Sequence, residues 1–165
     1  YSMDSYVFQS NAVPFTLVTA LDHLEGMTVQ VLSDGAVSPS QVVSGGQITL
    51  PSPAVHAVVG LQYTPTLKTL PIDRGAQTGS AAPYTKRYNK LILGLLDSAA
   101  PLVNGKRVPT RQAITPMNTV QPVKTGQTEQ VELGWSDGEI ITIEQDLPLP
   151  CTIIYVGGEL SQEIL

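Results

Sequence analysis

The stretch TVQVLSDG (residues 28–35) decides the fold class of this chain. Small polar and β-branched residues alternate over residues 28–32, and a period of two is typical of a half-buried β-strand. The stretch then ends in Ser33-Asp34-Gly35, residue types that favour a tight turn. This segment therefore predicts a short strand that leads into a turn.

The next segment repeats the pattern. QVVSGGQITL (residues 41–50) contains two short β-rich runs joined by Ser44-Gly45-Gly46. Paired glycines adopt the positive φ that a tight hairpin turn requires. We expect Pro51 and Pro53 to end the second run. A further strand is expected over residues 54–63, with His56 inside it.

Residues 85–98 form the most ambiguous segment, because their apolar residues fit both a strand and one face of a helix. Leu91, Leu93 and Leu95 follow strand alternation. Gly94 disfavours a helix interior. We therefore predict a strand.

The rest of the chain contains turn-rich and strand-like segments. Loops are expected at 71–85 and at the Pro-rich segment 99–127. Strands are expected at 129–135 and 147–160. Residues 136–145 are expected to form a turn at Asp137-Gly138 and then a strand with Ile141 and Ile143 on one face. The pattern predicts an all-β fold: an antiparallel barrel or sandwich of about seven or eight short strands with long Pro-rich loops. We expect one β-rich domain over 1–165, or two parts, 1–75 and 84–165.

Charge is sparse and acidic. Charged residues make up 14% of the chain, whereas about 25% is usual. A chain that buries surface against copies of itself can carry fewer charges. The net charge is −5 and the pI about 4.8, which argues against a basic face for nucleic acid. The main basic run is Lys86-Arg87, with Lys90 nearby.

Cysteine content and hydropathy exclude two classes of architecture. The single cysteine, Cys151, cannot form an internal disulfide, and its apolar surroundings predict packing as a small hydrophobic residue. No stretch of the sequence reaches the roughly 18 apolar residues of a membrane-spanning helix.

The segment LDHLEG (residues 21–26) is the strongest candidate for a metal or catalytic site, because it groups Asp22, His23 and Glu25. Adjacent side chains of an extended chain point to opposite faces, so Asp22 and His23 would diverge. His56 could complete a ligand set only if the fold brought it near. We expect instead that the segment caps the turn before residues 28–32, with Gly26 at the bend.

Other motifs favour structural roles. Ser44 lacks the strand-to-helix context of a nucleophile elbow, and Asp137 and Glu139 flank a glycine as turn residues do. Trp135, before that turn, is expected to fill the core. Tyr84 and Tyr88 interleave with the basic run and could stack on bases, but an ordinary solvated strand or a subunit contact is favoured. No catalytic residue, cofactor or metal is expected.

Six segments in a fixed order resemble a module of bacteriophage tail proteins, similar to the C-terminal part of the tail nozzle (tail tubular protein B) of short-tailed phages. The similarity spans about residues 17–156. The segments are LDHLEGMTVQVLSDGAV (21–37), VVSGGQITLP (42–51), VVGLQYTPTLKTLP (58–71), KRYNKLILGLLDS (86–98), TPMNTVQPVKTGQTEQVEL (115–133) and GWSDGEIITIEQDLPLPCTIIYV (134–156).

The resemblance implies a structural virion protein, a hexameric β-rich tube at the end of the tail through which DNA leaves without specific binding. Partners would be copies of the chain and other tail proteins. The start at Tyr1 would then reflect a fragment of a longer chain. The basic run is weaker than in the family. The matched residues would be turn formers and core residues: Gly26, Asp34, Gly35, Gly45, Gly46, Gly60, Tyr63, Trp135, Gly138 and Pro148.

Two alternatives remain at the level of sequence. The first is a host-surface or glycan-binding β-sandwich module of the tail tip, with loop 99–127 as its contact surface. The second is a hydrolase acting on the cell envelope, for which Asp137, Glu139 and His23 would be the residues to test.

Overall fold

The computed structural model describes residues 1–71, 86–110, 120, 122–128 and 140–162. The chain divides into two compact units, each made of three segments of sequence. Unit 1 contains residues 1–64, 113–122 and 146–150. Unit 2 contains residues 65–112, 123–145 and 151–165.

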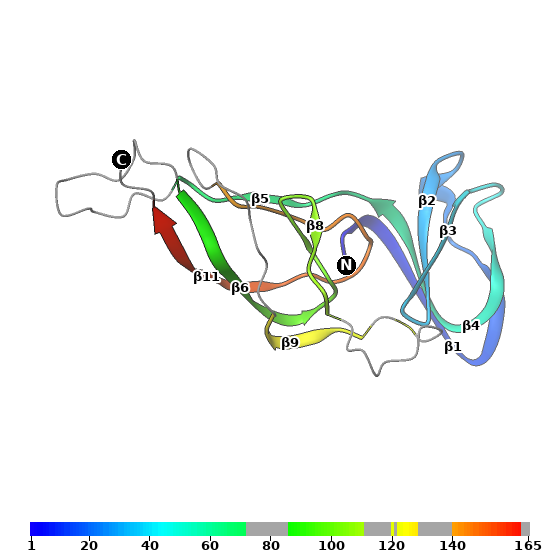
Figure 1. The fold of residues 1–165 in the computed structure, drawn as a ribbon. Helices are drawn as coiled ribbons and strands as arrows, with labels where there is room; N and C mark the ends of the chain where they lie inside the picture. Colours follow the sequence, from blue (N-terminus) through cyan, green and yellow to red (C-terminus); the bar gives the residue numbers. More distant parts are fainter. Residues whose placement is uncertain (72–85, 111–119, 121, 129–139, 163–165) are drawn as a thin grey trace. The chain divides into compact units, whose positions relative to one another are not determined.

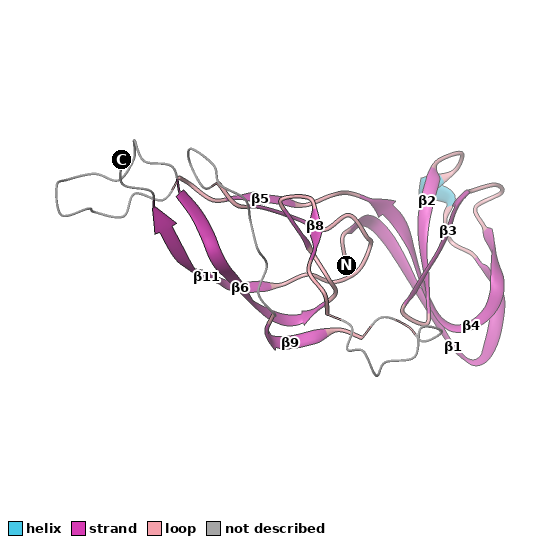
Figure 2. Cartoon of the chain, in the orientation of Figure 1, coloured by secondary structure: helices cyan, strands magenta, loops and turns pink. Residues whose placement is uncertain are grey.

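Strands take 64% of the described residues and helix 2%, so the predicted all-β class is confirmed. The sheets are antiparallel and none closes into a barrel, which favours a sandwich. The helical element of the described residues is a 3-10 turn, Asp22–Leu24, which lies beside β2 in Figure 2. In the part of the chain that the structure describes, no helix has the length and apolar character needed to cross a membrane.

Unit 1 is built on one four-stranded sheet. Its strands are β1 (Met3–Val18), β2 (Thr28–Ser33), β3 (Ala36–Val42) and β4 (Ile48–Gln62), in the order β1-β4-β2-β3. Strands β1 and β4 are much longer than the other two and curve together (Figure 1). In this order, strand β4 lies inside the sheet and pairs with β1 on one side and β2 on the other.

Residues 28–35 form the predicted strand and turn. Strand β2 leads into a two-residue turn at Asp34 and Gly35, whose φ angles are 48° and 81°, and Ser33 pairs with Ala36. Two successive positive φ angles suit the right-handed twist of the strands they join.

The Gly45-Gly46 turn is also confirmed, but the extended hairpin expected around it is wrong. Both glycines have positive φ, 65° and 67°. Only the bridge between Ser44 and Gln47 closes the turn. Beyond it β3 pairs with β2, whereas β4 pairs with β1 and β2. The turn therefore moves the chain to another place in the sheet.

The prediction that Pro51 and Pro53 end the strand is wrong, because β4 continues through both. Between the pairs Leu17–Thr49 and Phe15–Ala54, β4 has extra residues relative to β1. Strand β2 pairs with β4 only at residues 57–60. The two prolines therefore lie in a bulge where the ladder needs no N–H donor from them.

Strand β1 was not expected from the sequence. Its pattern is interrupted by Asn11 and Pro14, which lie in a second bulge between the pairs Ser10–His56 and Phe15–Ala54. A local pattern did not predict this strand because its pairing with β4 arises from residues 30 to 59 positions away.

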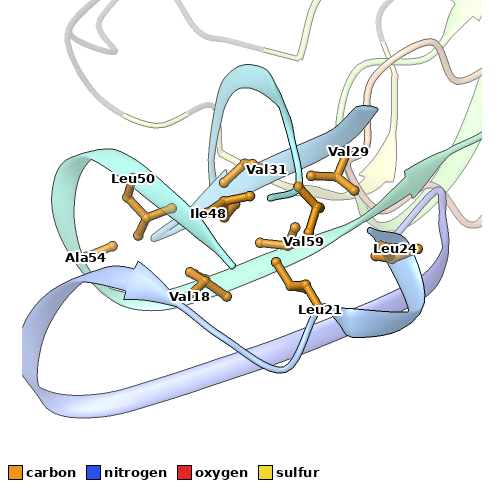
Figure 3. Packing of buried hydrophobic residues seen from close by; sticks show 11 residues of the cluster. Val18, Leu21, Leu24, Val29, Val31, Ile48, Leu50, Ala54 and Val59 are labelled. Atoms are coloured by element: carbon orange, nitrogen blue, oxygen red, sulfur yellow. The ribbon is translucent and has the colours of Figure 1, made fainter. Parts of the chain in front are cut away.

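The core of unit 1 lies against the sheet and is closed by the segment after β1. Figure 3 shows side chains from β1, the 3-10 turn, β2 and β4 pointing toward one another. The fully buried members of this cluster include Val18, Leu21, Val29, Val31 and Val59. Burying such side chains is the main favourable term in folding.

Unit 2 contains two smaller sheets. The first contains β5 (Thr66–Lys68), β7 (Leu102–Val103), β8 (Lys106–Arg107) and β10 (Thr142–Glu144), in the order β5-β10-β7-β8. The second contains β6 (Lys86–Ser98), β9 (Lys124–Gln127) and β11 (Ile153–Gln162), in the order β11-β6-β9.

The predicted strand over residues 85–98 is confirmed as β6. Leu91, Leu93 and Leu95 are fully buried, whereas Leu96 is 44% exposed. The three buried leucines belong to one apolar cluster with Val103, Ile141 and Ile143. Because these residues come from both sheets, one apolar core joins the two sheets as in a sandwich. Ile141 and Ile143 are both buried, as their predicted common face requires.

Other expectations have mixed outcomes. Segment 99–127 is not wholly irregular: Asn104 and Gly105, both with positive φ, join β7 and β8 as a hairpin turn. The strand predicted over 147–160 begins later, at Ile153, after bends at 147–149. Nearly all of loop 71–85 and the strand predicted at 129–135 lie outside the described residues.

The burial difference on β6 gives a direct test of this strand. We expect Leu93→Ala to lower the free energy of unfolding by about 2–5 kcal/mol, because it leaves a cavity in a closed core. Leu96→Ala, three residues away on the exposed face, should change it by less than about 1 kcal/mol. Chemical denaturation of both variants measures the difference. Equal losses would contradict the strand alternation.

Candidate functional site

The LDHLEG segment forms an intramolecular cap and does not bring its three titratable side chains into one ligand set. The Glu25 carboxylate accepts hydrogen bonds from the backbone N–H groups of Gly45 (2.9 Å) and Gly46 (2.7 Å). Two successive glycines with positive φ aim both N–H groups at one anion. Glu25 therefore caps the turn that precedes β4, and not the turn before β2 that the sequence suggested.

The same hydrogen bonds set the charge state of Glu25. They favour the ionised carboxylate and hold its pKa below the usual value, while slight desolvation acts in the opposite direction. Gly26, with φ of 75°, follows directly, and its N–H donates to the Val43 carbonyl. Glu25 and Gly26 therefore attach the segment to residues 43–46, which lie between β3 and β4.

Asp22 and His23 have separate surroundings. Asp22 lies beside Gly46, and a Cβ at position 46 would meet the end of its exposed side chain, which can turn aside. Nε2 of His23 donates to the Ser5 carbonyl at 2.9 Å. Among the described residues, no group of three or more His, Cys, Asp and Glu side chains is placed to hold a metal ion.

A second carboxylate has the same role at the other turn. Asp34 accepts from the backbone N–H groups of Val55 (3.1 Å) and His56 (2.7 Å), and its own N–H donates to the His56 carbonyl. These bonds attach the β2–β3 turn to β4. Glu25 therefore satisfies backbone donors of the turn before β4, and Asp34 satisfies backbone donors within β4.

The nearest approach to a nucleophile and base is a pair that the sequence did not suggest. Ser10 Oγ and His56 Nδ1 are 2.9 Å apart, on residues that face each other across β1 and β4. Phe8 stacks on the His56 ring with a centroid distance of 6.1 Å. A hydroxyl beside an imidazole is the core of a Ser–His site, but this pair is exposed on the surface of the β1–β4 pair. Its geometry is that of a cross-strand contact.

Three of the other matched residues have distinct roles. Gly60 has ordinary φ but lies under β1: a Cβ there would come within 2.7 Å of the Tyr6 Cβ and 2.9 Å of the Asp4 carbonyl oxygen. Pro148 is buried. Tyr63 is not a core residue, because it is 51% exposed just beyond β4. Trp135 and Gly138, together with Asp137 and Glu139, lie outside the described residues.

Unit 2 carries a small pocket of about 250 Å³. Pro65, Leu67, Ile143, Cys151 and Ile153 are among its lining residues. Burial raises the pKa of the Cys151 thiol, so the group stays protonated near neutral pH and is a poor nucleophile. The other lining residues are Thr66, Glu144 and Gln145, so the pocket has a mixed lining.

The charges of the chain divide unevenly between the units. Unit 1 contains five acidic residues and no Lys or Arg, which gives −5. The remaining nine acidic residues and all nine basic residues belong to unit 2 and cancel. The whole net charge of −5 therefore belongs to unit 1.

Comparison with known proteins adds no relative. No protein-family model matches the chain, and no match was found among curated proteins.

The two glycines of the capped turn give a test of its backbone conformation. Gly45→Ala should cost about 1–2 kcal/mol of unfolding free energy, because alanine strains at positive φ. Gly46→Ala should cost a similar amount, since its φ is also positive and its Cβ meets only the end of the exposed Asp22 side chain, which can rotate aside. Denaturant titration of the two variants provides the measurement. Variants as stable as the native chain would contradict the positive φ angles of this turn.

The capping role of Glu25 predicts a pH dependence. Its folded-state pKa is below the ordinary value of 4.5, so its contribution is complete above that value and is lost as the pH falls through the folded pKa. Glu25→Gln should lower the melting temperature at neutral pH, and the difference from the native chain should shrink in acid. Glu159→Gln is the control. It removes the same charge from an exposed ion pair, in which Glu159 Oε2 lies 3.8 Å from Lys90 Nζ. A constant gap across pH would contradict the capping role.

Proposed function

We propose that the chain is a non-enzymatic structural component of a bacteriophage tail, part of a nozzle or tail tube in which copies associate around the path of DNA. The proposal rests first on the ordered resemblance of six segments over residues 17–156. In this reading the protein belongs to the virion tail, and its partners are other copies, in a hexameric ring, and neighbouring tail proteins.

The proposal that the chain is not an enzyme rests on the contacts that its polar side chains make within unit 1. Glu25 and Asp34 are bound by backbone N–H groups, and His23 and His56 each contact another group of unit 1. A catalytic acid, base or nucleophile must instead face a site where substrate can bind. These side chains support a rigid sheet, which is what a tube wall requires.

The distribution of charge supports passage of DNA without retention. Unit 1 offers no Lys or Arg to neutralise phosphates, and phosphate neutralisation supplies most of non-specific DNA affinity. A wall that bears acidic residues repels DNA and allows it to slide.

Electron microscopy of purified particles with an antibody against this chain tests the proposal. We expect label at the tail tip and a sixfold ring formed by the labelled protein. Preincubation of the antibody with the purified chain is the control and should remove the label. Label on peripheral fibres would favour a host-surface-binding module instead, and particles without label would overturn the assignment to the virion.

A further inference from the structure

The hairpin turn between β7 and β8 contains a chemically labile pair of residues. Of the four asparagines in the chain, only Asn104 is followed by glycine. Both residues of this pair have positive φ, 45° for Asn104 and 76° for Gly105. Asparagine is among the heat-labile residue types that the proteins of hyperthermophiles contain less often. The surroundings of the turn therefore decide whether the Asn104 amide persists.

The turn is open to solvent. Asn104 and Gly105 are both exposed. Among the described residues, a Cβ added at Gly105 would meet no heavy atom within 4 Å beyond its chain neighbours. Glycine also lacks the side chain that hinders a close approach to the backbone. Water and hydroxide can therefore reach the backbone N–H of Gly105, and the Asn104 side chain has room to approach it.

One hydrogen bond makes the carbon of the Asn104 amide more reactive. The backbone N–H of Thr142 donates to Oδ1 of Asn104 at 2.8 Å. If a nitrogen adds to Cγ of Asn104, negative charge develops on Oδ1. A fixed donor at about 2.7–3.1 Å from such an oxygen stabilises the developing charge. The bond that positions the side chain therefore also favours attack at Cγ.

The hairpin is placed where it can open locally. Strands β7 and β8 have two residues each, and β8 lies at the edge of its sheet. Short elements at an edge open at a lower free energy than core strands do. Val103 and Val108, on either side of the turn, are fully buried. The backbone between them can thus rotate, and bring the Gly105 nitrogen to Cγ of Asn104, while the core stays closed.

We propose that Asn104 is a site of spontaneous deamidation, at which the chain converts its own side-chain amide into a carboxylate. Hydroxide removes the proton of the Gly105 N–H, and this nitrogen forms a bond to Cγ of Asn104. The Cγ–Nδ2 bond breaks, and the leaving nitrogen takes a proton from water and departs as ammonia. A cyclic imide remains. The inference does not depend on the proposed function, because the reaction needs only the chain and water.

Water then opens the imide at either of its two carbonyl carbons. Cleavage of the bond between Cγ and the Gly105 nitrogen gives aspartate. Cleavage of the bond between the Asn104 backbone carbonyl carbon and that nitrogen gives isoaspartate, in which the main chain runs through Cγ. Either product adds one negative charge, which changes the net charge of the chain from −5 to −6.

The two products affect the turn differently. An aspartate carboxylate still accepts the Thr142 N–H, as two carboxylates of unit 1 accept backbone N–H groups. Isoaspartate instead lengthens the main chain of a two-residue turn by one carbon atom. The turn sets the register of the strands that it joins, so the pairing of Val103 with Lys106 would be lost.

Peptide mapping by mass spectrometry tests the proposal on the full, folded chain kept in mildly alkaline buffer. The mass gain of an amide that becomes an acid should accumulate at Asn104, and faster at higher pH, because hydroxide starts the reaction. Asn11 is the internal control, since it is exposed but is followed by Ala12. Deamidation of Asn104 no faster than that of Asn11 would overturn the inference.

A pair of glycine variants tests the attacking nitrogen. Gly105→Ala should slow the deamidation of Asn104 severalfold or more, because the methyl group hinders attack by its own backbone nitrogen. Gly126→Ala is the matched control: Gly126 also has positive φ, 115°, and open space around its Cβ position. It should deamidate at Asn104 as the native chain does. A Gly105→Ala chain that deamidates at the native rate would contradict the proposed route.

Hydroxylamine provides a second measurement on the unmodified chain, for the case in which Gly105→Ala folds poorly. It attacks both carbonyl carbons of the imide and thereby cuts the chain between Asn104 and Gly105. Under native conditions we expect two fragments, one of which begins at Gly105. Cleavage of the denatured chain but not of the folded chain would show that the fold prevents ring closure, and would overturn the inference.

Discussion

Two carboxylates hold the irregular parts of unit 1 in place. Strand β4 is paired on both sides only near its end, and elsewhere it contains a bulge with two prolines. Glu25 binds the N–H groups of the turn that precedes β4, and Asp34 binds N–H groups in the middle of the strand. Backbone donors in such positions would otherwise depend on water. These bonds attach the segments on either side of β2 to β4 and to the turn that precedes it.

Period-two patterns in the sequence were sufficient to identify strands that alternate strictly. β2 and β6 are of this kind, because Val29 and Val31, and Leu91, Leu93 and Leu95, all face a core. Asn104-Gly105 also carried a readable hairpin signal within segment 99–127, which was interpreted as irregular. In each case the information lies within a few residues.

The remaining features could not be read locally. Strands β1 and β4 each contain a bulge, and the prolines in those bulges mimic strand ends. The partners of Glu25 lie 20 and 21 positions away, so the sequence suggested a capping role but the wrong turn. The requirement for Gly60 follows from its contact with Tyr6, and the Ser10–His56 pair from the cross-strand register. The bulges, the Glu25 cap, the requirement for Gly60 and the Ser10–His56 pair are all determined by contacts between segments distant in the sequence.

The interleaving of the two units bears on synthesis. Ser2 donates to the Leu149 carbonyl at 3.4 Å, and residues 146–150 belong to the same unit as the first 64. A ribosome delivers the chain from its N-terminus at roughly 5–20 residues per second. The first sheet can form early, but its last segment emerges several seconds later, after most of the other unit. During that interval Ser2 lacks its Leu149 acceptor, so the last contact of the first unit can form only after most of the other unit has been made.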